Sequence, residues 1–141
     1  MQRHVLMLDL KDDPATIAAY REHHRRVWPE VVESLQRAGI EELEIYLLGR
    51  RLVMIVETRD GVDVAHAFAT HAASSARVVE WERLMASMQE PVPGAAPGEW
   101  WARMEPVFRL TDQASAGAHG DRSLHDGVWG DARPVERSRR S

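Results

Sequence analysis

The chain contains no cysteine, which excludes disulfides, thiolate metal sites and cysteine nucleophiles. It also has no excess of basic residues. The formal net charge is -4 at pH 7, so neither a nucleic-acid backbone nor a membrane surface is an expected partner. No apolar stretch approaches the roughly 20 residues that cross a bilayer, and the N-terminal apolar run is too short for a signal peptide. From these absences we expect a cytoplasmic protein.

Motifs for nucleotide binding and for covalent hydrolysis are missing too. The sequence has no GxGxxG, no P-loop and no GxSxG pattern. His66 and His71 could join His24 as metal ligands, but no HxH or HExxH spacing supports such a site. We therefore expect no metal and no other cofactor.

Four stretches carry the alternating or continuous apolar pattern of strands. Residues 3–10 form the first, and residues 42–48 and 51–57 form two more, separated by Gly49-Arg50 as in a tight hairpin. Residues 104–110 alternate again and predict a last strand, which Pro106 would place at an edge or a bulge.

The intervening segments have the pattern of helices. From Pro14 to Ala38 apolar residues recur every three or four positions, with Asp13 as a candidate N-cap and Gly39 as a candidate C-cap. Pro29 interrupts this pattern, so we expect a kink or a restart near Trp28. A second, broken helix is predicted over 61–72 and 75–89, followed by a proline- and glycine-rich loop over 91–99.

The resulting order of elements is strand, helix, strand, strand, helix, strand. It predicts an α+β, ferredoxin-like βαββαβ fold with an antiparallel sheet in residues 1–110. The strand over 51–57 is apolar on both faces, whereas one helix layer covers only one face. A second subunit is the simplest cover, so a homodimer is expected. Residues 111–141 form a polar tail for which we expect disorder.

Tyr20, His24 and Trp28 are spaced by four residues and would share one stripe of a continuous helix. Histidine can both give and take a proton near neutral pH, so His24 beside a tyrosine hydroxyl is a candidate acid–base group. From the residues alone, a core or boundary histidine remains the more common alternative. The tryptophans at 81, 100 and 101 could equally stack on sugar rings or fill the core.

The segment YREHHRRVWPE, residues 20–30, resembles the YxxxHxxxWPE motif of the L-rhamnose mutarotase family. The resemblance extends to residues 45–47 (IYL), to Trp81 with the LM pair at 84–85, and to residues 105–108 (EPVF). It covers roughly residues 3–110.

This resemblance implies a dimeric α/β barrel enzyme that interconverts the α and β anomers of a 6-deoxy-L-hexose without a cofactor. It implies His24 as the proton-transfer residue and Tyr20 as a sugar contact. Leu43 stands where the family has a substrate-contacting tyrosine, and Glu82 replaces the second residue of a Trp-Trp pair. L-Rhamnose and L-fucose are therefore both candidate substrates. The residues expected to bind the sugar are Tyr20, Tyr46, Trp81, Trp28 and Glu82.

Two other functions stay open at this point. One is a different dimeric barrel enzyme, such as a small monooxygenase or a haem-degrading protein, which would bind an aromatic or macrocyclic substrate. The other is a sugar-binding dimer without catalytic activity.

Overall fold

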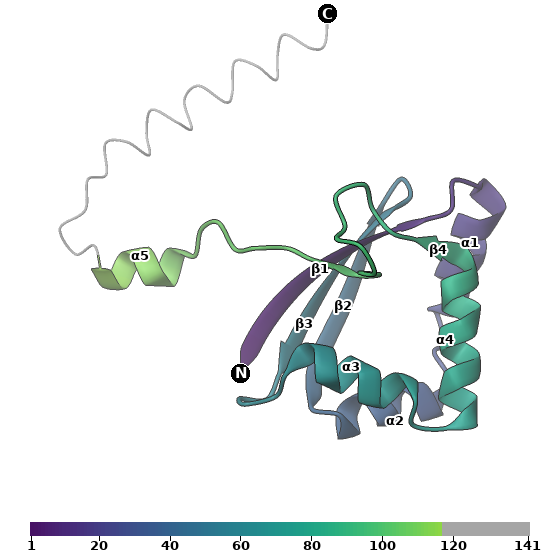
Figure 1. Ribbon diagram of the computed structural model, residues 1–141, viewed down its shortest axis with the longest axis horizontal. Helices are drawn as coiled ribbons and strands as arrows, with labels where there is room; N and C mark the ends of the chain where they lie inside the picture. Colours follow the sequence, from purple (N-terminus) through teal and green to yellow (C-terminus); the bar gives the residue numbers. More distant parts are fainter. Residues whose placement is uncertain (117–141) are drawn as a thin grey trace, which may run out of the picture. The chain divides into compact units, whose positions relative to one another are not determined.

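The computed structural model describes residues 1–116, and the chain divides into a unit spanning Met1–Glu105 and a segment from Pro106 onward. The first unit contains one antiparallel sheet (Figure 1). Its strands are β1 (Gln2–Leu10), β2 (Ile40–Leu48), β3 (Arg51–Thr58), β4 (Gln89–Glu90) and β5 (Ala102–Arg103). Their order is β2-β3-β1-β4, and β5 also pairs with β1. This arrangement confirms the ferredoxin-like α+β prediction.

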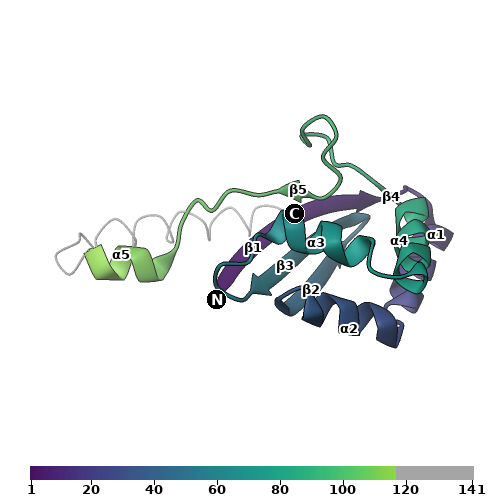
Figure 2. The same cartoon turned by 60° about the horizontal axis from the view of Figure 1, so that its bottom comes forward.

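Four helices lie on one side of this sheet. They are α1 (Pro14–His23), α2 (Pro29–Arg37), α3 (Val64–Ala72) and α4 (Ala76–Met88). In Figure 2, α3 lies in front of the strands, α2 below them, and α1 and α4 at the right-hand end. Side-chain caps fix where three of these helices begin, because the oxygen of a capping residue satisfies an otherwise unpaired N–H of the first turn. The capping residues are Asp13 for α1, Asp63 for α3 and Ser75 for α4.

The segment from Pro14 to Ala38 restarts at Pro29, as expected. Trp28 has φ -58° and ψ 136°, an extended conformation that the following proline imposes on its neighbour. The segment is therefore two helices, and Trp28 precedes α2 instead of continuing the stripe of Tyr20 and His24. Our expectation that these three residues share a stripe is wrong for Trp28. Gly39 follows α2 with φ +100°, a conformation that suits glycine.

The last strand is not where the sequence pattern placed it. Residues 104–109 have no regular structure, and α5 (Leu110–Ala116) follows them. The short strands β4 and β5 take the edge positions along β1 instead. Pro106 has no N–H to donate to a neighbouring strand, which disfavours pairing at 104–110. Residues 111–116 of the expected disordered tail belong to α5, and 117–141 lie outside the described residues.

The core lies between the helices and the face of the sheet that they cover, which we call the inner face. Residues directly opposite each other on neighbouring strands point to the same face, and the register aligns Met54 with both Leu6 and Ile45. The buried inner-face residues of β1 and β3 are Leu6, Leu8, Leu10, Leu52, Met54 and Val56. On the opposite, outer face of β3, Val53 and Ile55 are only half-buried. In residues 1–116 no helix is long and apolar enough to cross a membrane.

Candidate active site

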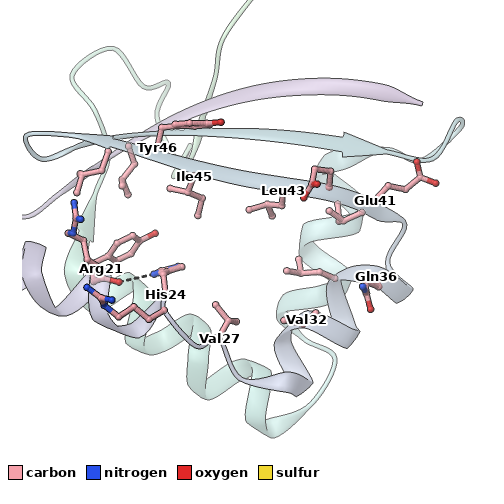
Figure 3. Close-up of a pocket in the computed structure, with 16 residues that line it drawn as sticks. Arg21, His24, Val27, Val32, Gln36, Glu41, Leu43, Ile45 and Tyr46 are labelled. Atoms are coloured by element: carbon pink, nitrogen blue, oxygen red, sulfur yellow. Dashed lines mark hydrogen bonds between the residues drawn. The ribbon is translucent and has the colours of Figure 1, made fainter.

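A cavity of about 680 Å³ lies between the inner face of the sheet and the helices. We call it the histidine pocket, and its polar and aromatic lining includes Tyr20, His24, His71, Trp81, Glu82, Gln89 and Trp100. A second, more open cavity of about 800 Å³ is also lined by Tyr20 and His24 (Figure 3). Both volumes lie in the range typical of small-ligand sites.

His24 owes its position to the end of α1. The last carbonyls of a helix have no intrahelical partner, and the break before Pro29 ends α1 at His23. The carbonyl of Tyr20 accepts a hydrogen bond from His24 Nδ1 at 2.8 Å. Since a carbonyl only accepts, Nδ1 must carry the hydrogen, so Nε2 of the neutral ring carries a lone pair. Figure 3 shows the ring directed into the cavity, with Nδ1 held at the helix end.

The surroundings of His24 disfavour its charged form. Burial lowers the pKa of His24 below its ordinary value of 6.5, and the nearby His23 adds to this effect, while the bond to the Tyr20 carbonyl opposes it. Its ring lies 4.3 Å from the ring of Tyr20 and 5.6 Å from that of Trp81, measured between centroids. His24 is therefore a neutral base at neutral pH, held between two aromatic rings.

Tyr20 presents its hydroxyl through a defined chain of hydrogen bonds. The indole Nε1 of Trp100, which can only donate, bonds the side-chain oxygen of Gln89 at 2.9 Å. The amide nitrogen of Gln89 therefore faces Tyr20 and donates to its hydroxyl oxygen at 3.3 Å. Burial raises the pKa of Tyr20 to about 12. The hydroxyl stays protonated, and because its bond with Gln89 uses only the oxygen, its hydrogen can be donated to a ligand.

The tryptophans divide between the pocket and the layer behind it. Trp81, Trp100 and Trp101 line the histidine pocket. Trp28 lines neither cavity. It packs edge-on against Trp81, with ring centroids 5.1 Å apart, and the guanidinium of Arg77 covers its ring. The structure thus places Trp28 beside Trp81, outside the lining of both cavities, and its role as a sugar contact stays a prediction.

Tyr46 does not face His24. Successive side chains of a strand point to opposite faces, and Tyr46 aligns with Val53 on the outer face of the sheet. Its side chain is 56% exposed, and its hydroxyl bonds Glu44. In Figure 3 Ile45 and Leu43 point from β2 toward His24, whereas Tyr46 lies on the other side of the strand. Tyr46 is counted among the residues that line the more open cavity, but its ring lies outside the histidine pocket, so its role as a sugar contact stays a prediction.

Glu82 does line the histidine pocket, and the structure joins it to a residue that sequence reasoning left without a role. His71 Nε2 lies 3.4 Å from Glu82 Oε2. The two residues belong to different helices separated by the Ser74-Ser75 break, so no local spacing in the sequence signals their contact.

The segment between β4 and β5 closes one side of the pocket through Trp100 and Trp101. Glu99 fixes the end of this segment, because its carboxylate accepts hydrogen bonds from the backbone N–H groups of Ala96 and Arg103. These bonds lower the pKa of Glu99. These two bonds tie the end of the proline- and glycine-rich loop to the start of β5.

The arrangement suits proton transfer to a small polar ligand. Within residues 1–116 no group of three or more histidine or acidic side chains could hold a metal ion. What the pocket offers is a neutral histidine, a protonated tyrosine, an amide, a carboxylate and aromatic walls. Fold and site together define a ferredoxin-like protein with an acid–base pocket sized for a molecule such as a monosaccharide.

Comparison with known proteins identifies the family. Residues 3–110 match the family model of L-rhamnose mutarotase, so the chain belongs to the L-rhamnose mutarotase family. It is a carbohydrate isomerase of the type that interconverts the anomers of 6-deoxy hexoses. The resemblance inferred from the YxxxHxxxWPE motif is confirmed, and neither a monooxygenase or haem-degrading barrel nor a non-catalytic sugar binder is favoured.

Two relatives and one structure illustrate the match. An L-fucose mutarotase from Xanthomonas campestris pv. campestris is 48% identical over 117 residues, which is 82% of this chain and 93% of the relative. An L-rhamnose mutarotase from Acidiphilium cryptum is 32% identical over 60% of this chain and 79% of its own length. The crystal structure of L-rhamnose mutarotase from Formosa agariphila covers 77% of this chain and 98% of its own, with a TM-score of 0.56 and 20% identity.

Proposed function

We propose that the chain is an L-fucose mutarotase in which His24 Nε2 exchanges a proton with the sugar. The observation that carries this proposal is the fixed tautomer of His24, whose Nδ1–H is bound to the Tyr20 carbonyl. A neutral imidazole with its lone pair directed into a cavity can accept the proton of the anomeric hydroxyl.

The proposed reaction returns every proton to its source. His24 takes the proton of the anomeric hydroxyl while a second group of the pocket, acting as a general acid, gives a proton to the ring oxygen, and the ring opens to an aldehyde. The aldehyde turns about its bond to C2 and the ring recloses on the other side, reversing both transfers. Tyr20 donates its hydroxyl hydrogen to a sugar oxygen, and the faces of Trp81 and Trp100 cover the apolar side of the ring.

The choice of L-fucose rests on the relative from X. campestris, which matches most of both chains at 48% identity. Two pocket residues fit a substrate other than L-rhamnose. Leu43 and Glu82 depart from the residues that the L-rhamnose motif would place there, and both line the histidine pocket. A carboxylate in place of an indole exchanges an apolar contact for a strong hydrogen-bond acceptor.

We also propose that two copies pair through the outer face of the sheet. The centre of this face is apolar and half-buried, and consists of Val5, Met7, Val53 and Ile55. Ion pairs between Asp9 and Arg51 and between Arg3 and Glu57 flank it at the two ends. An apolar centre with a polar rim is the usual composition of a protein interface.

Saturation-transfer NMR of the two anomers tests the activity directly. We expect the wild-type protein to accelerate exchange of L-fucose more than that of L-rhamnose. The His24→Ala variant should lose about 10²–10⁴-fold in exchange rate, because it lacks the general acid–base group. The exposed His66 offers a matched control, and His66→Ala should exchange at the wild-type rate.

The result has two clear failure modes. A folded His24→Ala protein that still exchanges both sugars normally would remove His24 from the mechanism. Faster exchange of L-rhamnose than of L-fucose by the wild-type protein would overturn the choice of sugar and leave the family assignment intact.

A further inference from the structure

A chain of two hydroxyl groups lies behind the histidine pocket and runs from the buried Ser34 on α2 to the exposed Ser74 after α3. His71 is 3% exposed, and its Nδ1 lies 2.8 Å from the hydroxyl oxygen of Ser34. That oxygen lies 2.9 Å from the hydroxyl of Ser74, which bonds the backbone carbonyl of His71 at 2.8 Å. The side chains of Ser34 on α2, His71 on α3 and Ser74 in the connection between α3 and α4 thus form a closed circuit around one imidazole.

The direction of every hydrogen in this circuit can be assigned. The carbonyl of His71 only accepts, so Ser74 donates its hydrogen to it. Ser74 must then accept from Ser34, and Ser34 in turn accepts from His71. Nδ1 of His71 therefore carries a hydrogen, and Nε2 is the nitrogen left to face the carboxylate of Glu82.

Nε2 of His71 and Oε2 of Glu82 lie 3.4 Å apart. Without a proton between them, a lone pair would face an ionised carboxylate, and two acceptors repel each other at this distance. One added proton turns the contact into an ion pair or a hydrogen bond. A hydrogen bond between Nε2 and Oε2 therefore requires one proton between the two atoms.

The two members of the pair differ in their access to the pocket. The side chain of Glu82 is 43% exposed and borders the cavity next to Trp81, whose ring contacts His24. The ring of His71 is almost wholly enclosed and is oriented by the two serine hydroxyls. The carboxylate of Glu82 can contact a ligand in the pocket, and the imidazole of His71 behind it can exchange a proton with that carboxylate.

We propose that His71 and Glu82 form the second proton carrier of the mutarotation, with Glu82 meeting the sugar and His71 positioning it and sharing its proton. This proposal rests on the proposed function. Mutarotation needs a group that gives a proton to the ring oxygen while another takes one from the anomeric hydroxyl. His24 at rest has a bare Nε2 and can only take a proton, and Tyr20, whose pKa is raised to about 12, holds its proton too tightly to be the acid of choice. The proposal assigns the proton for the ring oxygen to the pair.

The proton balance closes over one turnover. As the ring opens, Glu82 transfers the shared proton to the ring oxygen, and His24 Nε2 receives the anomeric proton. As the ring recloses on the other face, His24 returns its proton to the new anomeric oxygen. The former ring oxygen, now a hydroxyl, gives its proton back to the carboxylate, and His71 shares it again.

The first test removes the carboxylate and keeps its shape. Glu82→Gln should lower the exchange rate at saturating sugar at least tenfold, because a general acid contributes about 10²–10⁴-fold and water replaces it in part. Glu80→Gln, a neighbouring exposed carboxylate on α4, is the matched control and should exchange normally. Formate should restore part of the exchange to Glu82→Ala, by supplying a carboxyl group in the space left, and should leave His24→Ala inactive.

The second test observes the proton itself. In the free wild-type protein, the ¹⁵N shifts of the His71 ring should show a protonated Nδ1 and a proton at or shared by Nε2. In Glu82→Gln, Nε2 should shift toward the value of a bare nitrogen. A purely structural pairing would predict no formate rescue.

The outcomes separate this inference from the function on which it rests. If the wild-type protein exchanges the anomers and Glu82→Gln is equally active, the proposal that His71 and Glu82 carry the second proton is overturned. The mutarotase proposal is unaffected by that result. A bare Nε2 on His71 in the wild-type protein overturns it as well. A wild-type protein that exchanges neither sugar overturns both proposals.

Discussion

The two faces of the sheet are built from the same kinds of residue and serve different ends. Along β3, Leu52, Met54 and Val56 point inward and are buried beneath the helices, while Val53 and Ile55 point outward and are half-buried. The inner face opens into the histidine pocket, whereas the outer face is an apolar centre between two ion pairs. The helix layer decides which face becomes a site, since strand residues alone are nearly equivalent on both.

The two tyrosines of the chain show the same contrast. Tyr20 is 4% exposed, bonded to Gln89 and next to His24, and its pKa is raised to about 12 by burial. Tyr46 lies on the outer face and bonds only a neighbouring carboxylate on its own strand. The resemblance to the family includes both residues, but only Tyr20, on the helix-covered face, lines the histidine pocket.

The largest expected effect comes from placing a charge on the outer face. Ile55→Glu should weaken the proposed homodimer by roughly 100-fold, or about 2.7 kcal/mol, because the interface would bury an unpaired carboxylate. Sedimentation velocity over a range of concentrations measures the change. Val79→Glu places the same charge on the helix layer and should leave association unchanged. Equal association of both variants would show that the outer face is not the interface.

The second prediction compares the tyrosines directly. Tyr20→Phe should lower kcat/KM for anomer exchange about tenfold, or about 1.4 kcal/mol, because it removes one hydrogen-bond donor from the sugar and leaves Gln89 without its acceptor. Tyr46→Phe should leave kcat/KM unchanged within twofold. A larger loss in Tyr46→Phe would reverse the assignment of the two faces.

The smallest effect concerns pH. The base form of His24 is the neutral ring, and burial on the inner face lowers its pKa below 6.5. The neutral form therefore still predominates at pH 6.5, and on the acid side kcat/KM should fall as the pH drops below the lowered pKa. An exposed histidine would be half protonated at about 6.5. A profile of kcat/KM against pH that reaches half its maximum at or above pH 6.5 would show that the pocket does not lower the pKa of His24.

Much of the fold follows from local signals in the sequence. The side chain of Asp13 caps α1, Pro29 ends the helical conformation at Trp28, and Gly49 adopts the positive φ that the tight turn between β2 and β3 requires. Each depends on the backbone of a few adjacent residues, so each can be predicted before the tertiary structure is known. The predicted strand at 104–110 is absent because an alternating pattern shows only which side chains could face the core. It does not show whether the edge of a neighbouring strand is available for pairing.

The site was predicted less completely than the fold. His24, Tyr20, Trp81 and Glu82 were expected near the sugar, and the structure places all four around the histidine pocket. Trp28 was expected there too, but the proline that follows it turns it behind Trp81. Gln89 and Trp100, which orient the hydroxyl of Tyr20, were not recognised as a pair, because they lie eleven positions apart, one at a helix end and the other in a loop.

The sequence by itself determined the elements, their caps and the motif that carries His24, because these depend on backbone preferences and on side-chain spacing within one element. The tertiary structure alone decided that His71 faces Glu82, that Tyr46 faces away, and that β4 and β5 form the edge along β1. These features depend on which distant segments come together. Their contacts are set by strand register and helix packing over the whole unit, and no short stretch of sequence encodes them.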